Sequence, residues 1–315
     1  MPAITASAPG KVILFGEHAV VYGRPAIAVP VNEVRARATV NADPRGVPGT
    51  MRIQAPAIGL DALLADLPDD QPLAAAVSSV LSMLEISRVP ACTLRITSTI
   101  PLASGLGSGA AVSVAILRAL SAFLGQPLSD EQVSALAFEV EKLHHGTPSG
   151  IDNTVITYVR PVYFVRGQPI QTLQVAQPFT IVIGDTGISS PTAIAVGDVR
   201  RLWGEKPAHY ESLFDSAGQI ARQARQAIES GRPEELGALM DANHSLLQEM
   251  GVSSPELDRL VSAAHTSGAR GAKLSGSGRG GNMIALASPE TASLIANALS
   301  AAGAYRTIVT TVHSK

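Results

Sequence analysis

The sequence of 315 residues has few of the features that mark disulfide-bonded, metal-cluster or membrane proteins. Its one cysteine, Cys92, excludes an internal disulfide and any metal site built from several cysteines. Its longest apolar stretches, such as LAAAVSSVLSML at 73–84, fall short of the roughly 20 residues that span a bilayer. The first residues, MPAITASAPGK, lack the charged and then apolar pattern of a secretion signal. We therefore expect a cytoplasmic protein that has no membrane partner.

A surplus of charge of one sign is also missing. The chain carries 24 lysines and arginines against 26 aspartates and glutamates, which gives a formal net charge of −2 and a pI near 6.4. Without a basic excess, nucleic acid is not an expected partner. Hydrophobic residues make up 46% of the chain, so it can bury a large core. An anionic ligand would therefore be held by local geometry rather than by bulk attraction.

The order of the predicted elements is typical of two α+β domains. Alternating β-branched runs predict strands at 6–16, 26–41, 92–99 and 155–165. Apolar spacing predicts helices at 72–87, 108–124 and 129–145. From residue 181 onward the pattern of apolar residues changes. There we predict helices at 208–230, 233–250, 255–267 and 289–303, and strands at 181–186, 271–274, 282–287 and 306–313. This order predicts an N-terminal domain over 1–170 and a C-terminal domain with an antiparallel sheet over 171–315.

The stretch PLASGLGSGAA at 101–111 places glycines and serines directly before a predicted helix. Backbone N–H groups at a helix start are unpaired and lie at the positive end of the helix dipole. Glycines there let a phosphate approach the backbone, so the loop predicts a phosphate-binding site, with a tight strand-to-helix turn as the alternative. A second run, GSGRGG at 276–281, satisfies G-x-G-x-x-G, but a predicted strand follows it, which excludes a dinucleotide site.

Three polar residues outside the loop supply the other groups that phosphoryl transfer requires. Lys11 begins the first strand-like run, Glu141 lies near a predicted helix end, and Asp152 lies in the turn beyond it. One carboxylate such as Glu141, with the hydroxyl of Ser108, phosphate oxygens and water, is sufficient for Mg2+. Each residue also has an ordinary alternative: a surface lysine, a helix pair of Glu141 with His145, and a turn cap at Asp152.

Three stretches together resemble the GHMP small-molecule kinase family: residues 8–28 (APGKVILFGEHAVVYGRPAIA), 101–111 (PLASGLGSGAA) and 273–286 (KLSGSGRGGNMIAL). Within them, GEHAVVYG at 16–23, together with HGTPSGIDN at 145–153, resembles the members that phosphorylate mevalonate. The resemblance implies a two-domain α+β fold, with an N-terminal domain like domain 2 of ribosomal protein S5 and a ferredoxin-like C-terminal domain. It also implies that ATP lies in the cleft between the domains.

The activity that the resemblance implies is the ATP- and Mg2+-dependent phosphorylation of a primary alcohol. The expected reaction converts mevalonate to 5-phosphomevalonate in isoprenoid biosynthesis, and family members are often homodimers. A kinase for another small alcohol, phosphomevalonate or homoserine, is one alternative. A metabolite sensor on the same fold, without catalysis, is the other.

Matching the motifs residue by residue assigns roles within this sequence. Asp152 takes the place of the catalytic aspartate, and Lys11 that of the lysine paired with it. Glu141 and Ser108 match the magnesium ligands. The residues expected around the acceptor alcohol are Glu17, His18, Thr186 and Ser277. Those expected around the ATP phosphates are Ser104, Gly105, Leu106, Gly107, Ser108, Gly109 and Ala110.

The chain departs from the family pattern at three places. Gly109 stands where the loop commonly has a second serine, so Ser108 is the remaining hydroxyl at that point. Ser190 and Pro191 stand where a basic residue often precedes a threonine, so another group is expected to hold the substrate carboxylate. Arg279 interrupts the glycine run of the third motif (residues 273–286), where it either adds charge near the phosphates or points to solvent.

Overall fold

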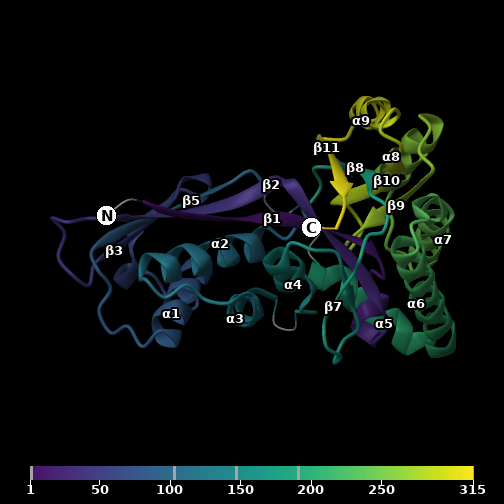
Figure 1. Cartoon of the computed structure of the whole chain (residues 1–315). Helices are drawn as coiled ribbons and strands as arrows, with labels where there is room; N and C mark the ends of the chain where they lie inside the picture. Colours follow the sequence, from purple (N-terminus) through teal and green to yellow (C-terminus); the bar gives the residue numbers. More distant parts are fainter. Residues whose placement is uncertain (1–2, 102–103, 146–147, 190–191, 315) are drawn as a thin grey trace. The chain divides into compact units, whose positions relative to one another are not determined.

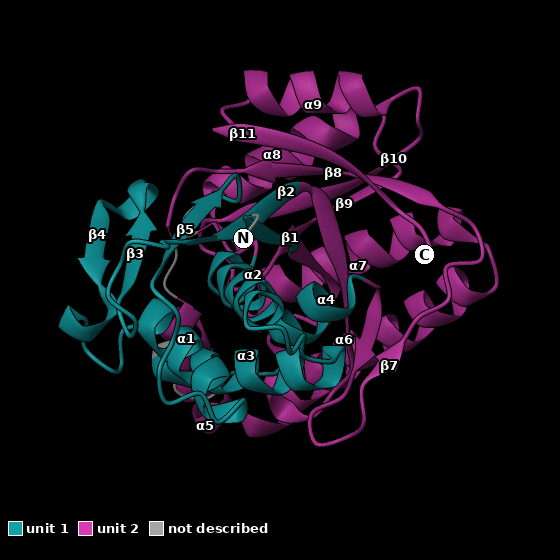
Figure 2. Cartoon of the chain, turned by 60° about the vertical axis from the view of Figure 1, so that its left-hand side comes forward, with its two compact units in different colours: residues 1–10, 34–101, 107–159 teal, residues 11–33, 102–106, 160–315 magenta. Residues whose placement is uncertain are grey.

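The computed structural model describes residues 3–101, 104–145, 148–189 and 192–314 (Figure 1). The chain divides into two compact units, coloured separately in Figure 2. Unit 1 comprises residues 1–10, 34–101 and 107–159, and unit 2 comprises residues 11–33, 102–106 and 160–315.

The elements carry the labels of Figure 1. The strands are β1 (Ile4–Phe15), β2 (Ala26–Ala42), β3 (Met51–Ala55), β4 (Leu60–Leu63), β5 (Cys92–Ser98), β6 (Val162–Phe164), β7 (Gln171–Thr172), β8 (Phe179–Asp185), β9 (Gly271–Ser275), β10 (Asn282–Ala287) and β11 (Arg306–Val312). The helices are α1 (Pro72–Met83), α2 (Ser108–Phe123), α3 (Asp130–His145), α4 (Ile151–Tyr158), α5 (Thr192–Glu205), α6 (Pro207–Glu229), α7 (Leu236–Glu249), α8 (Pro255–Thr266) and α9 (Ala292–Ala301). A short 3-10 helix, η1 (Ala19–Tyr22), follows β1.

Unit 1 is a sheet with helices packed on one face. Its strands run in the order β4-β3-β5-β2, where β2 and β5 are antiparallel and β3 and β5 are parallel. Along β2, the buried residues Ala36, Ala38 and Val40 alternate with the more exposed Arg37 and Thr39, as expected for a sheet with one covered face. The helices α1, α2 and α3 pack on one another, and α2 is buried nearly all round because its residues are small or apolar.

The structure corrects the sequence prediction of a strand at 155–165. Residues 151–158 form α4, and only Val162–Phe164, in β6, form a strand. The prediction was wrong because the β-branched side chains of Val155 and Ile156 are buried where α4 packs on α2 and α3, and this packing outweighs their strand propensity. The helix α5 was not predicted either, although Ala195, Val199, Leu202 and Trp203 follow helical spacing. Only Ala195 and Val199 of its side chains are buried.

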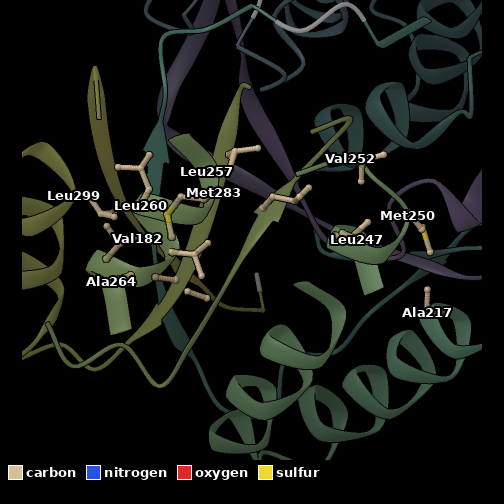
Figure 3. Close-up of a cluster of buried hydrophobic side chains, with 14 of the residues drawn as sticks. Val182, Ala217, Leu247, Met250, Val252, Leu257, Leu260, Ala264, Met283 and Leu299 are labelled. Atoms are coloured by element: carbon tan, nitrogen blue, oxygen red, sulfur yellow. The ribbon is translucent and has the colours of Figure 1, made fainter. Parts of the chain in front are cut away.

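Unit 2 contains a four-stranded sheet in the order β11-β8-β10-β9. Its pairs are antiparallel, as the sequence predicted. Figure 3 shows part of the apolar core that the sheet shares with its helices, including Val182, Met283, Leu260 and Leu247. The same cluster contains Ala19 of η1, so the segment after β1 is part of the core of unit 2.

The edge strand β9 is covered by side chains of α7. The backbone N–H of Ala272 donates to Asp241 Oδ1 at 2.9 Å, and that of Leu274 donates to His244 Nδ1 at 3.3 Å. Gly237 of α7 allows this close approach, because a Cβ there would overlap the carbonyl of Arg270. The helix therefore satisfies backbone donors that an edge strand otherwise exposes.

The two units are not continuous in the chain. One division falls after residue 159, and residues 11–33 and 102–106 also belong to unit 2. The reason is that the long strands β1 and β2 contribute residues to both units. Among the residues that the structure describes, no helix combines the length and the apolar character needed to cross a membrane.

Candidate active site

The first half of the glycine loop, residues 104–106, is held within unit 2 by both other motifs. The backbone N–H of Lys11 donates to the carbonyl of Leu106 at 3.0 Å. The side-chain amide of Asn282, at the end of the third motif, donates to the carbonyl of Ser104. Three stretches separated by about a hundred residues or more in the sequence are thus joined by hydrogen bonds to backbone carbonyls.

The second half of the loop opens α2 in unit 1. Gly107 precedes the helix at φ +74°, a conformation that favours glycine, and no side chain among the described residues caps the helix start. Ser108 is half-buried and Gly109 is exposed. A helix start without a side-chain cap is the arrangement that binds anions, because its first N–H groups lack partners within the helix.

The position of Gly109 leaves room for a side chain. A Cβ at this residue would meet nothing within 4 Å, and its φ is not positive. The absence of the second serine is therefore not forced by the backbone.

Glu141 and Asp152 lie on two other helices of unit 1. Glu141 is on α3 and is only 7% exposed, whereas Asp152 is half-buried in the first turn of α4. The adjacent Asn153 fixes that turn, because its amide donates to the hydroxyl of Ser134 at 2.9 Å and to the same residue's carbonyl at 3.1 Å. Since α2, α3 and α4 pack on one another, Ser108, Glu141 and Asp152 are carried by three helices in mutual contact.

The turn after β1 in unit 2 carries two buried ionisable residues. Glu17 forms an ion pair with Lys273 of β9, and neither side chain has any exposed surface. Burial raises the pKa of the Glu17 carboxyl, and the ammonium of Lys273 opposes that shift. His18 adopts φ +58°, and its Nε2 lies 3.0 Å from the carbonyl oxygen of Ser277. Burial is the main cause that lowers the pKa of His18 to about 4, so the ring is neutral at pH 7.

Thr186, which follows β8, is hydrogen-bonded to the third motif (residues 273–286). Its hydroxyl and its backbone N–H both donate to the carbonyl of Gly281, at 2.9 and 2.8 Å. The hydroxyl also accepts from the N–H of Ile188 at 3.2 Å. Thr186 is therefore bound to the glycine run 276–281, which contains Ser277. Ser190 and Pro191 lie outside the described residues.

Arg279 is tied to two other segments of unit 2. Its guanidinium forms an ion pair with Asp198 of α5 and donates to the carbonyl of Gly251 at 3.4 Å, and its backbone N–H donates to Val252 at 2.8 Å. Its side chain is 34% exposed. A Cβ at Gly278 would overlap the carbonyl of Val252, so close packing requires glycine there. The GSGRGG run is thus a packed turn tied to α5 and to the segment between α7 and α8.

Sequence reasoning missed three residues that hold this region together: Lys273, Asn282 and Asp198. A lysine inside an otherwise apolar predicted strand was a signal for the first, because a lysine is rarely buried without a partner. The other two are polar residues whose partners are more than 80 positions away, and no local pattern marks them.

Comparisons with known proteins agree with the motifs. The family model described as GHMP kinases N terminal domain matches residues 73–160, and the model GHMP kinases C terminal matches residues 224–304. The chain is 39% identical to a mevalonate kinase of Thermococcus gammatolerans, over 95% of this chain and 93% of that protein.

Solved structures give the same result for the fold. The crystal structure of L. major mevalonate kinase in complex with R-mevalonate has a TM-score of 0.84 at 34% identity and covers 99% of this chain and 96% of that chain. The mevalonate kinase of Methanococcus jannaschii has a TM-score of 0.85 at 24% identity, with coverage of 100% and 99%. The second likeness bears on the fold alone.

Proposed function

Because the chain belongs to the GHMP kinase family, we propose that it phosphorylates the primary alcohol of mevalonate, with ATP as the donor. The observation that carries this proposal is the set of bonds that join the three motifs, from Lys11 to Leu106, from Asn282 to Ser104 and from His18 to Ser277. The likeness to mevalonate kinases over nearly the whole chain supports mevalonate as the acceptor.

The loop residues Ser104–Ala110 would hold the nucleotide phosphates. The first turn of α2 fits an anion because its N–H groups lack a side-chain cap among the described residues, and Gly109 places no Cβ in the way. The backbone groups of the loop bind and align the phosphates. This alignment matters more than a strong base, because the transition state of phosphoryl transfer is loose.

Glu141 and Ser108 would hold Mg2+, which neutralises phosphate charge when it is bound. Both are oxygen donors of the kind that this ion prefers. The described residues contain no group of three or more histidine, cysteine or acidic side chains suited to a metal. Such a sparse donor set fits an ion that completes its coordination with phosphate oxygens and water.

Asp152 accepts the proton of the acceptor hydroxyl, and Lys11 stabilises the negative charge that grows on the transferring group. Asn153 orients Asp152 by tying the first turn of α4 to Ser134. Glu17, His18, Thr186 and Ser277 form the acceptor side, where packed turns fix the backbone. With Ser190 and Pro191 in place of a basic residue, another group holds the substrate carboxylate.

The direct test is a product assay. Purified protein is incubated with Mg2+, ATP and mevalonate, and a singly phosphorylated product is sought by mass spectrometry. ADP release is then compared among mevalonate, phosphomevalonate and homoserine. Preference for another alcohol would replace mevalonate in the proposal, and ligand binding without ADP formation from any of them would indicate a sensor.

Two broader proposals are a cytoplasmic location, which rests on the sequence pattern and the single cysteine, and a homodimer, which rests on the family resemblance. Light scattering of the purified protein tests the second, since a mass near 32.5 kDa would be that of a single chain. Cell fractionation tests the first.

A further inference from the structure

The ion pair between Lys273 and Glu17 joins two motifs that lie 256 positions apart. Neither side chain is exposed, so both charges are removed from water. The ammonium of Lys273 also donates to the carbonyl of Leu274 at 2.6 Å. A buried charge is costly unless it is paired and hydrogen-bonded, so each of these groups depends on the other for its place.

Lys273 projects from a strand that is fixed on both sides. On one side β9 pairs with β10, and on the other the N–H groups of Ala272 and Leu274 are bound by α7. The backbone that carries the ammonium of Lys273 is therefore held in place by both β10 and α7.

The segment that Lys273 contacts is a strained turn. His18 is not a glycine, yet it adopts φ +58°, which an ordinary side chain rarely takes. Such a conformation persists only where the surroundings hold it. Glu17 and His18 in this turn are also among the residues proposed to contact the acceptor alcohol, so the backbone conformation of the turn affects the binding of that alcohol.

Three contacts from residues 273, 275 and 277 hold the end of β1 and this turn. The Ser275 hydroxyl donates to the carbonyl of Ile13 at 2.7 Å, Lys273 pairs with Glu17, and the carbonyl of Ser277 meets His18 Nε2. Lys273 and Ser275 are two apart in β9 and therefore project to the same face, and both contact the first motif, residues 8–28. Only the contact from Lys273 is charged.

We propose that Lys273 is a positioning residue for the acceptor side of the site. Its ion pair with Glu17 fixes the turn from Gly16 to His18 and thereby places His18. The inference rests on the proposed function for its effect on catalysis. A purely stabilising role would not need this pair, because replacing a buried ion pair with apolar residues is often neutral or favourable for stability.

The activity test compares the KM for mevalonate with that for ATP. In Lys273→Met we expect the KM for mevalonate to rise at least about tenfold, while the KM for ATP changes less than about twofold. The matched control, Arg52→Met, breaks an exposed ion pair with Asp61 in unit 1 and is expected to leave both constants unchanged. A folded Lys273→Met enzyme with the wild-type KM for mevalonate would overturn the proposal.

The double variant Glu17→Gln with Lys273→Met removes both charges, so it also serves if the single variant does not fold. If Lys273 acts through Glu17, adding Lys273→Met to Glu17→Gln changes the KM for mevalonate by less than about twofold. A further rise of threefold or more would mean that Lys273 acts on its own, contrary to the proposal.

A spectroscopic readout separates this inference from the proposed function. NMR titration of His18 in the wild-type protein is expected to show its depressed pKa, near 4. In the double variant, whose net charge is unchanged, a loosened turn admits water and the pKa rises toward 6.5. An unchanged pKa would refute the positioning role even in a protein that phosphorylates mevalonate. If wild-type protein yields no product, the proposed function fails while this titration still decides the inference.

Discussion

At the scale of single residues, the proposed roles that matter most for the reaction are those of Asp152 and Glu141, two carboxylates of unit 1. Asp152 and Glu141 differ in exposure, because Asp152 is half-buried at a helix start and Glu141 is almost completely enclosed on α3. The difference suits their proposed roles, since a general base must reach the acceptor and a metal ligand benefits from a fixed position. Each assignment can be tested with a matched control in the same unit.

Replacing Asp152 with asparagine keeps the shape of the side chain and removes its ability to accept a proton. We expect kcat to fall about 10²-fold or more, while ATP affinity is retained, because the role is confined to the chemical step. Steady-state kinetics and calorimetric titration with ATP measure the two quantities. Asp130→Asn, which alters another aspartate in the first turn of a unit 1 helix, is expected to turn over like the wild type. Normal turnover in Asp152→Asn would remove the general-base role.

Glu141→Gln tests the metal site. Because a charged oxygen ligand is lost, we expect the Mg2+ concentration for half-maximal activity to rise about tenfold or more. Circular dichroism checks that the fold persists. The control is Glu139→Gln on the same helix, where the exposed carboxylate pairs with Lys142. An unchanged Mg2+ requirement would exclude Glu141 as a ligand.

At the scale of elements, the contact between α7 and the edge strand β9 depends on the protonation state of His244. His244 Nδ1 accepts from the backbone of Leu274, so the ring must be neutral, with its proton on Nε2, which lies 3.2 Å from Asp258. Burial lowers the pKa of His244 and nearby Lys273 adds to the shift, whereas Asp258 and Asp241 oppose it. The folded protein therefore binds a proton here less readily than the unfolded chain.

The consequence for stability has a definite sign. A histidine with a depressed pKa contributes fully above its unfolded value near 6.5, and its contribution is lost as the pH falls below that value. We expect the free energy of unfolding to fall more between pH 7.5 and about 5 in the wild type than in His244→Asn, which retains an acceptor but does not titrate. Denaturant unfolding at several pH values measures this difference. If the free energy of unfolding falls with pH equally in both proteins, protonation of His244 does not affect the stability of strand β9.

At the scale of the whole molecule, local motifs predicted the fold class, while long-range contacts were beyond the sequence. The helix start at Ser108 and the strand after the glycine run 276–281 were predicted correctly, because glycines and apolar spacing act locally. The prediction for Val155 failed where tertiary packing decided the outcome. The ion pair of Glu17 with Lys273 and the tether from Arg279 to Asp198 depend on which distant segments meet, and one sequence does not encode that in any local pattern.

Nucleotide binding should stabilise the protein against unfolding, because a ligand that binds the folded state adds to the free energy of unfolding. A ligand present at 100 times its Kd adds about 2.7 kcal/mol. We expect Mg2+ and ATP together to raise the melting temperature, measured by calorimetry. An unchanged melting temperature at saturating Mg2+ and ATP would contradict nucleotide binding.

The split composition of unit 2 bears on how the chain is made. Residues 11–33 leave the ribosome early, yet Ala19 and Glu17 find their partners only when the segment around Met283 and Lys273 has been translated. The side chain of Glu17, which is fully buried in the folded protein, therefore remains without its partner Lys273 during most of synthesis. By the same logic, a fragment beginning at residue 171 would expose the unpaired ammonium of Lys273 and the apolar surface that Ala19 covers, so it is a poor candidate for expression on its own.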